Sequence, residues 1–151
     1  MGHGLPMAVG MALASERSGA SWKTYCLMSD GELNCGTTWE SAAIAAHHEL
    51  DNLILIVDAN GWQAMGKPED VLNMEPLDAK WKAFGWETIE IDGHDYAKLE
   101  MALRLKKEKK PLVIIARTTK GKGVSFMENN PKFHGTAPTP AEVQLALQEL
   151  Q

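Results

Sequence analysis

The chain has 151 residues, of which 44% are hydrophobic and 23% are charged, a composition typical of one globular domain. Its 15 Lys and Arg against 20 Asp and Glu residues give a formal net charge of -5, and no dense basic run predicts nucleic acid or an acidic membrane as a partner. Two cysteines without CxxC spacing indicate a reducing compartment, so a cytoplasmic location is expected. We expect no targeting leader and no membrane anchor, since no stretch approaches about 20 apolar residues.

The first part of the chain predicts alternating helices and strands. In order these are a helix over Leu5–Ser15, a strand over Thr24–Met28, a helix over Thr38–Leu50 and a strand over Leu53–Asp58. Thr37 and Glu40 have the spacing of a capping box at the start of the second helix. The second strand is a continuous aliphatic run, which favours a strand covered on both faces.

The alternation continues to the end of the chain. It predicts a helix over Leu77–Phe84, a strand over Thr88–Ile91, a helix over Tyr96–Lys107, a strand over Leu112–Ala116 and a helix over Pro140–Leu150. Gly85 can end the first of these helices, Asp95 can cap the next, and Thr139 with Glu142 forms a second capping box. The order predicts an α/β fold, with a doubly wound, mainly parallel sheet and helices on both faces.

Polar residues directly follow the first two predicted strands. Asp30 follows one and Asn60 follows the other, and ligands of open parallel sheets collect at the carboxyl ends of strands. A hard divalent cation takes oxygen ligands, which Asp30, Asn60 and the backbone carbonyl of Trp62 could supply. Gly31 would allow a diphosphate to approach the backbone closely. Asp-Gly and Asn-Gly are also common turn dipeptides, so an ordinary pair of turns is the alternative interpretation.

Several segments together resemble the N-terminal, diphosphate-binding subunit of a transketolase, in particular the split type with two separate polypeptides. They are Gly2-His3-Gly4-Leu5-Pro6 to Ala14, Ser29-Asp30-Gly31-Glu32-Leu33, Trp39-Glu40-Ser41-Ala42, Asn52-Leu53 to Gln63, Phe84-Gly85-Trp86, Ile91-Asp92-Gly93-His94-Asp95, Thr119-Lys120-Gly121-Lys122-Gly123-Val124 and Phe133-His134-Gly135. The resemblance covers essentially the whole chain and implies thiamine diphosphate as cofactor. The last two segments favour transketolase over other thiamine diphosphate enzymes.

The resemblance implies roles for individual residues. Asp30 and Asn60 would bind Mg²⁺ or Ca²⁺ through their side chains, and Trp62 through its carbonyl. Those implied in cofactor binding are His3, Gly4, Ser29, Asp30, Gly31, Glu32, Asn60, Trp62 and His134. His134 and Glu40 would take part in catalysis, His134 near the cofactor and donor substrate, and Glu40 in an acid network between paired sites. Structural alternatives are the helix cap for Glu40 and a flexible chain end for His3.

Two departures from the family pattern affect what we expect. The chain begins inside the Gly-rich loop, so residues 1–151 would form a thiamine diphosphate-binding domain that lacks the family's N-terminal segment. Ser29 replaces the usual first glycine of the metal loop, and Cys35 stands where the family usually has a glutamate that links the two cofactors. A neutral thiol cannot carry that charge.

The resemblance implies a subunit that transfers a two-carbon ketol unit between sugar phosphates. Its partner would be a separate pyrimidine-binding subunit, and it would form a homo-oligomer. Two alternatives stay open: a component of another thiamine diphosphate enzyme, such as a dehydrogenase or deoxyxylulose phosphate synthase, and a non-catalytic cofactor-binding or assembly protein.

Overall fold

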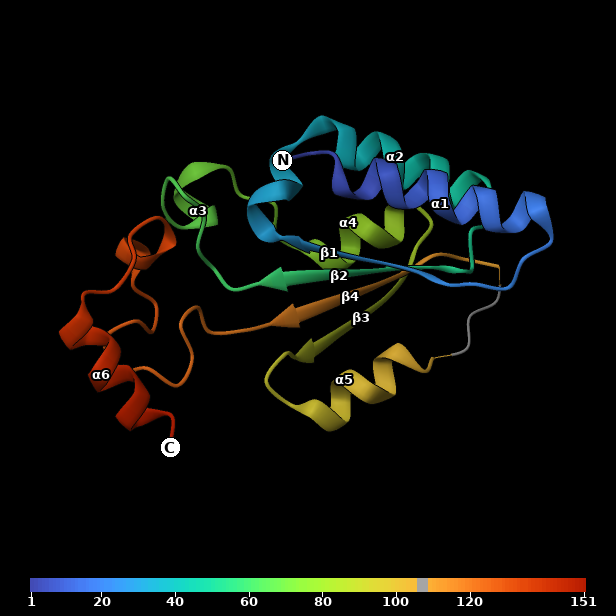
Figure 1. Ribbon diagram of the computed structural model, residues 1–151. Helices are drawn as coiled ribbons and strands as arrows, with labels where there is room; N and C mark the ends of the chain where they lie inside the picture. The colour runs from blue at the N-terminus through green and yellow to red at the C-terminus, as the bar shows by residue number, and fades with distance from the viewer. Residues whose placement is uncertain (106–108) are drawn as a thin grey trace.

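The strands of the protein form one parallel sheet. The computed structural model describes residues 1–105 and 109–151, and its four strands lie in the order β1-β2-β4-β3. The strands are β1 (Thr24–Ser29), β2 (Leu53–Ala59), β3 (Glu87–Asp92) and β4 (Leu112–Arg117), and each described pairing is parallel. All four strands therefore point to the same edge of the sheet (Figure 1). The parallel sheet predicted from the aliphatic runs is confirmed.

Helices cover both faces of this sheet, as predicted. The helices are α1 (Gly4–Ser18), α2 (Gly36–His47), α3 (Pro68–Val71), α4 (Leu77–Ala83), α5 (Tyr96–Leu103) and α6 (Pro140–Glu149), with 3-10 helices η1 (Asp30–Asn34) and η2 (Pro131–His134). Figure 1 shows α1, α2 and α4 on one face and α5 on the other, with α3 and α6 beyond the carboxyl ends of the strands. No helix within the described ranges is long and apolar enough to span a bilayer.

The core lies in two layers, one on each face of the sheet. Alternate residues of β2 serve different layers, because side chains along a strand point to opposite faces: Leu55 and Val57 join the layer under α1, α2 and α4, and Ile54 joins the layer on the α5 side. The edge strand β1 differs, since its Tyr25 and Leu27 are 52% and 71% exposed. In β1, therefore, only the face toward α1 and α2 is buried.

A cluster of three tryptophans joins α2, α4 and the residue that precedes β3. The ring centroids of Trp39 and Trp81 are 4.9 Å apart, and those of Trp81 and Trp86 are 5.0 Å apart. Trp86 Nε1 donates a hydrogen bond to the Ala42 carbonyl of α2 at 2.9 Å. Aromatic pairs at such distances stabilise a fold beyond the area they bury. The cluster therefore packs α2 against α4 and the start of β3.

Two of the three predicted helix starts have the predicted caps. Thr139 and Glu142 form a complete capping box at α6, and the Asp95 side chain accepts hydrogen bonds from two N–H groups at the start of α5. The capping box predicted at Thr37 is wrong. Helix α2 begins at Gly36, so Thr37 already lies in the first turn, and its hydroxyl donates to the Gly2 carbonyl at 2.7 Å.

Helix boundaries differ from the predictions by a few residues. Helix α2 ends at His47 rather than Leu50, and α5 ends at Leu103. Lys107, the predicted end of the latter, lies outside the described residues. The segment after β1, expected as a loop, forms η1.

Candidate functional site

The predicted metal residues come together at the carboxyl edge of the sheet. Strands β1 and β2 are neighbours with Ser29 opposite Asp58, so the segments that follow them leave the sheet side by side. The Asp30 carboxylate accepts a hydrogen bond on Oδ2 from the backbone N–H of Gly61 at 2.9 Å. This contact links the two loops, which are 31 residues apart in the sequence.

The Asp30 carboxylate is buried with half of its hydrogen-bonding capacity unused. The residue is 5% exposed, and its Oδ1 is buried without a hydrogen-bond partner among the described residues. Burial raises the pKa of the Asp30 carboxyl above its ordinary value, the charge of Asp58 raises it too, and backbone hydrogen bonds led by that of Gly61 oppose the rise. A buried charge without a partner is costly, so this oxygen suits a cation.

The Asn60 side chain is held at both ends of its amide. Its Oδ1 accepts from the backbone N–H of Trp62 at 3.0 Å, and its Nδ2 donates to Asp58 Oδ2 at 3.2 Å. The other Asp58 oxygen accepts from the hydroxyl of Thr118, just after β4. The loop after β2 is thereby folded back so that residues 60–62 lie beside Asp30.

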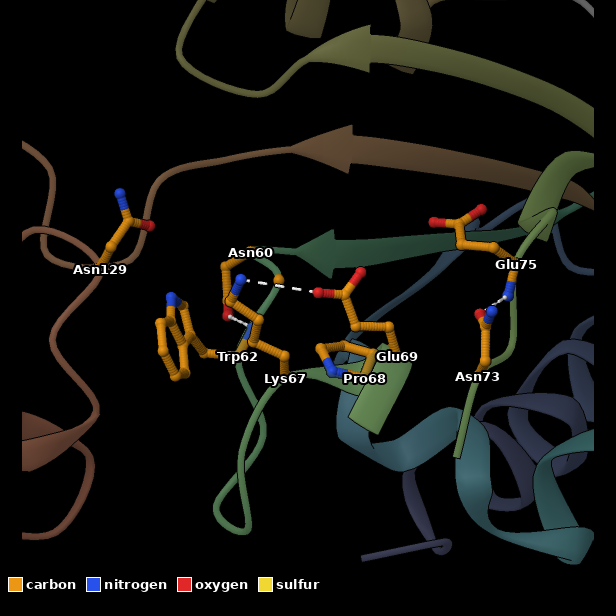
Figure 2. Close-up of a pocket in the computed structure, with 9 residues that line it drawn as sticks. Asn60, Trp62, Lys67, Pro68, Glu69, Asn73, Glu75 and Asn129 are labelled. Carbon is orange, nitrogen blue, oxygen red and sulfur yellow. Dashed lines mark hydrogen bonds and ion pairs between the residues drawn. The ribbon is translucent and has the colours of Figure 1, made fainter. Parts of the chain in front are cut away.

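Three cavities border these residues. Figure 2 shows the largest of the three, of about 660 Å³, with Asn60, Trp62 and Lys67 at one side and Asn129 across from the Trp62 ring. Another, of about 440 Å³, is lined by Asn60 and Asp58. Asp30 and Gln63 line a smaller cavity of about 80 Å³, large enough for water. The Oε1 of Gln63 accepts from Asn34 at 3.0 Å, while its Nε2 is buried without a partner within residues 1–105 and 109–151.

The Gly-rich loop is attached to the metal loop through Glu32. The backbone N–H of Gly2 donates to Glu32 Oε1 at 2.9 Å. Gly2 has a φ of +78°, and a Cβ there would lie 2.7 Å from Thr37 Oγ1, so the loop requires glycine at this position. Glu32 therefore holds the start of α1 beside Asp30. His3 is exposed, with Nδ1 2.9 Å from the Met1 carbonyl, and Gly4 is the first residue of α1.

The remaining predicted residues lie at various places around this edge. Ser29 ends β1 and is exposed, and Gly31 is buried in η1. His134 ends η2 and is exposed, and Glu40 is exposed on α2. In the described part of the chain, no hydrogen bond or ion pair joins either of these two to Asp30 or Asn60. The structure thus brings together Asp30, Asn60, Trp62 and Glu32, and leaves His134 and Glu40 apart from them.

The residues present fit a hard divalent cation. A carboxylate, an amide oxygen and a backbone carbonyl are the ligands such ions take, with phosphate oxygens and water completing the shell. Within the described residues, no group of three or more His, Cys, Asp or Glu could hold a metal by itself. A cation bound to Asp30 would therefore be held by amide and carbonyl oxygens of the loop after β2, and not by further acidic side chains.

Asp58 and Thr118 are not among the predicted site residues. The sequence places Asp58 at the end of a strand and Thr118 at the start of a long loop, where neither has an evident partner. One signal could have identified Asp58. It lies two residues before Asn60, and because side chains along a strand alternate between faces, both side chains are expected on the face of the sheet toward α5.

The fold and the site define an α/β protein whose polar site residues lie at the carboxyl edge of a parallel sheet, where open α/β sheets commonly bind ligands. The chain belongs to the transketolase family, because its residues 1–150 match the family described as transketolase, thiamine diphosphate binding domain. The resemblance seen in the sequence is confirmed.

Relatives of known name agree with this assignment. The chain is 48% identical to one of the subunits of the apulose-4-phosphate transketolase of Actinobacillus succinogenes, over 100% of this chain and 55% of that protein. It is 40% identical to the polypeptide of the same name from Phocaeicola vulgatus, over 99% of this chain and 54% of that protein. The chain thus spans about half the length of the curated relatives it matches.

The fold is also that of transketolases. The structure superimposes on the crystal structure of the Campylobacter jejuni transketolase with a TM-score of 0.93 and 35% sequence identity, covering 99% of this chain and 25% of that one. Of the thiamine diphosphate enzyme classes that the metal loop left open, the chain therefore matches transketolase.

Proposed function

We propose that this chain binds thiamine diphosphate together with a divalent cation, Mg²⁺ or Ca²⁺. In this proposal it is the diphosphate-binding half of an enzyme that transfers a two-carbon ketol unit between sugar phosphates. The observation that carries the proposal is the buried, unpartnered Oδ1 of Asp30, in the described part of the chain, beside residues 60–62. It is supported by the match to the thiamine diphosphate binding domain.

The proposed cation ligands are the side chains of Asp30 and Asn60 and the carbonyl of Trp62. The cation would offset the negative charge of Asp30 and of the diphosphate together. Around the diphosphate we place the backbone of Ser29, Gly31 and Glu32. We place His3 and Gly4, at the start of α1, beside the cofactor, because the Gly2–Glu32 hydrogen bond holds this loop against η1.

The chain's own contribution to the reaction is binding and proton transfer. When bound, the cofactor supplies the nucleophilic carbon that takes up the two-carbon unit. An imidazole can donate a hydrogen bond or carry a proton near neutral pH, and this is the role we propose for His134. Its exposure on η2 leaves the ring open to a bound substrate. Glu40, exposed on α2, is proposed to act across an interface between two copies.

The proposed partner is a separate pyrimidine-binding subunit. Two relatives are named as single subunits of a transketolase, which supports a second polypeptide. Both names also give apulose 4-phosphate, so this sugar phosphate is the first substrate to test. We expect that the site becomes complete only when the two polypeptides meet.

We further propose that the chain forms a homo-oligomer through the outer surface of α1 and α2. Met7 and Met11 of α1 are 64% and 59% exposed, and Ile44 of α2 is 47% exposed. Neighbouring exposed apolar side chains of this kind mark interaction surfaces. Light scattering at micromolar concentration should give a dimer or larger species, and Met11→Glu should shift it toward the monomer. A monomeric parent protein would contradict the proposal.

The metal site is tested by calorimetry of thiamine diphosphate binding. The parent chain should bind the cofactor with Mg²⁺ present and much more weakly with a chelator. Asp30→Ala should weaken binding by more than the about 10–100-fold typical of outer-shell residues, because it removes a direct ligand. The control is Asp70→Ala, an exposed residue of α3. Equal cofactor affinity in the parent and Asp30→Ala would remove the case for this site.

A further inference from the structure

Asp58 is a carboxylate that the proposed metal site does not use as a ligand. It is the second-last residue of β2, and it is partly buried on the side of the sheet that faces α5. Its Oδ2 accepts a hydrogen bond from Asn60 Nδ2 at 3.2 Å. Its Oδ1 accepts from the hydroxyl of Thr118. Both carboxylate oxygens are therefore engaged, one of them by a proposed metal ligand.

Thr118 is placed at Asp58 by the neighbouring strand. Asp58 lies opposite Ala116 in the parallel register of β2 and β4, and the backbone N–H of Thr118 donates to the Ala59 carbonyl at 3.4 Å. Gly93 packs closely against the methyl group of Thr118, since a Cβ at position 93 would lie 2.5 Å from Thr118 Cγ2. The Thr118 side chain is thus packed in place with its hydroxyl on Asp58.

These contacts decide the orientation of the Asn60 amide. In the observed orientation, the NH₂ group faces an acceptor, Asp58 Oδ2, and the carbonyl oxygen faces a donor, the N–H of Trp62. A flipped amide would set oxygen against carboxylate oxygen and NH₂ against N–H. Only the carbonyl end of an amide has lone pairs for a cation, and the amide oxygen has two of them, so its bond to Trp62 leaves one available.

We propose that Asp58, held by Thr118, is a positioning residue that keeps the oxygen of Asn60, rather than its NH₂ group, available as a metal ligand. This inference rests on the proposed cation site at Asp30 and Asn60. Partners of metal-binding side chains commonly orient them in this way. Asp58 also adds a negative charge near Asp30, which favours a cation between the two strands.

The test is the apparent Mg²⁺ affinity, measured by calorimetry as Mg²⁺ is titrated into each chain at one fixed excess concentration of thiamine diphosphate. Asp58→Asn should weaken Mg²⁺ binding by about 10–100-fold, because its own amide can pair with a flipped Asn60. Thr118→Val keeps the shape of the side chain but removes the hydroxyl, so it should give a smaller loss in the same direction. Asp70→Asn makes the same charge change on the exposed surface of α3 and should leave affinity unchanged.

A swapped pair separates positioning from a general structural role. In Asp58→Asn/Asn60→Asp, a carboxylate at position 60 presents oxygen in either orientation, and the new amide at position 58 can donate to it. The swap should recover most of the Mg²⁺ affinity that Asp58→Asn loses, at the same net charge as the parent. Mn²⁺ titration followed by electron paramagnetic resonance gives an independent count of bound metal.

The outcomes distinguish the inference from the function on which it rests. Unchanged Mg²⁺ affinity in Asp58→Asn, with binding lost in Asp30→Ala, overturns the positioning role and leaves the proposed metal site standing. Failure of the swap to recover affinity also overturns it. Absence of metal-dependent cofactor binding in the parent overturns the proposed function itself. If Asp58→Asn does not fold, Thr118→Val and the swap decide in its place.

Discussion

The Asp30 carboxyl must be ionised to bind a metal, but its ionised form destabilises the metal-free fold because it is buried. Its Oδ1 is buried without a partner in the described ranges, and burial raises its pKa above the ordinary 3.8. The folded state therefore holds the proton more tightly than the unfolded state does. Below pH about 3.8 both states are protonated and the residue contributes no penalty; as pH rises through the raised pKa, the ionised form destabilises the fold.

We therefore predict that Asp30→Asn stabilises the metal-free chain at neutral pH by about 1 kcal/mol, because a neutral amide is less costly to bury than a charge. The gain should vanish in acid. Urea unfolding at several pH values, with a chelator, measures it. Mg²⁺ with cofactor should stabilise the parent and not the variant. A variant less stable than the parent at pH 7, with no change of the difference toward acid, would contradict this account.

At the scale of single residues, the sequence located the ends of the strands but not the contacts around them. The proximity of Asp30 to the loop that carries Asn60 could be predicted, because both follow strands and the edge of a parallel sheet brings such residues together. Asp58 could not be assigned a role, because its partner Thr118 follows β4, 60 residues away. The register between β2 and β4 depends on how the whole sheet assembles, so it cannot be deduced from the sequence of either strand alone.

At the scale of helices and strands, the two central tryptophans of the core differ in how their indole N–H groups are used. Trp86 Nε1 donates to the Ala42 carbonyl, whereas Trp81 Nε1 is buried without a partner in the described chain. Both rings are almost completely buried, at 2% and 0% exposure. Replacement by phenylalanine leaves a similar void at each position, so the hydrogen bond should decide the difference.

We predict that Trp86→Phe lowers the free energy of unfolding by about 1 kcal/mol more than Trp81→Phe, which is the usual net value of one buried hydrogen bond. Chemical denaturation of both variants beside the parent gives the comparison. Trp22→Phe is the matched control, since Trp22 is 49% exposed and should change stability little. A larger loss for Trp81→Phe would mean that ring packing dominates over the hydrogen bond.

The two predicted capping boxes, at Thr37 and at Thr139, show that the local sequence pattern alone does not determine how a helix begins. Thr139 forms a complete box at the start of α6, a helix that lies away from the sheet (Figure 1). The pattern at Thr37 is identical in spacing, but the Gly2 carbonyl takes its hydroxyl and the helix starts one residue before it. A contact 35 residues away thus overrides the local preference.

At the scale of the whole molecule, the alternation of helix and strand predicted the parallel sheet but not the strand order. The insertion of β4 between β2 and β3 depends on which apolar surfaces meet, and continuous aliphatic runs are equally suited to either central position. The exposure of one face of β1, which carries Tyr25 and Leu27, was also not predicted. The four central residues of β1, Tyr-Cys-Leu-Met, are all hydrophobic, so the sequence does not show which face is exposed.

The proposal that the active site is formed by this chain and a separate pyrimidine-binding subunit makes a prediction about activity. The chain alone should show no measurable ketol transfer from xylulose 5-phosphate or apulose 4-phosphate to an aldose phosphate, with excess thiamine diphosphate and Mg²⁺. The partner subunit is proposed to supply the acid-base group that activates the cofactor, and such help contributes typically about 10²–10⁴-fold. Adding a matched partner should restore turnover, and Asp30→Ala should abolish it again. Turnover by the chain alone, lost in Asp30→Ala, would overturn the prediction.

The tryptophan cluster also determines what the protein's intrinsic fluorescence can report. Trp39, Trp81 and Trp86 lie close enough to exchange excitation energy, and their buried surroundings should give a blue-shifted emission that changes only when the fold opens. Trp62 is partly buried beside Asn60 and lines the cavity of about 660 Å³, outside that cluster (Figure 2). The exposed Trp22 also emits on the red side, so replacing it with phenylalanine leaves Trp62 as the tryptophan outside the cluster. In that variant, occupation of the site should alter the red side of the emission band while leaving the blue side constant. Intensities recorded separately at two wavelengths would then follow ligand binding and unfolding as two signals in one titration.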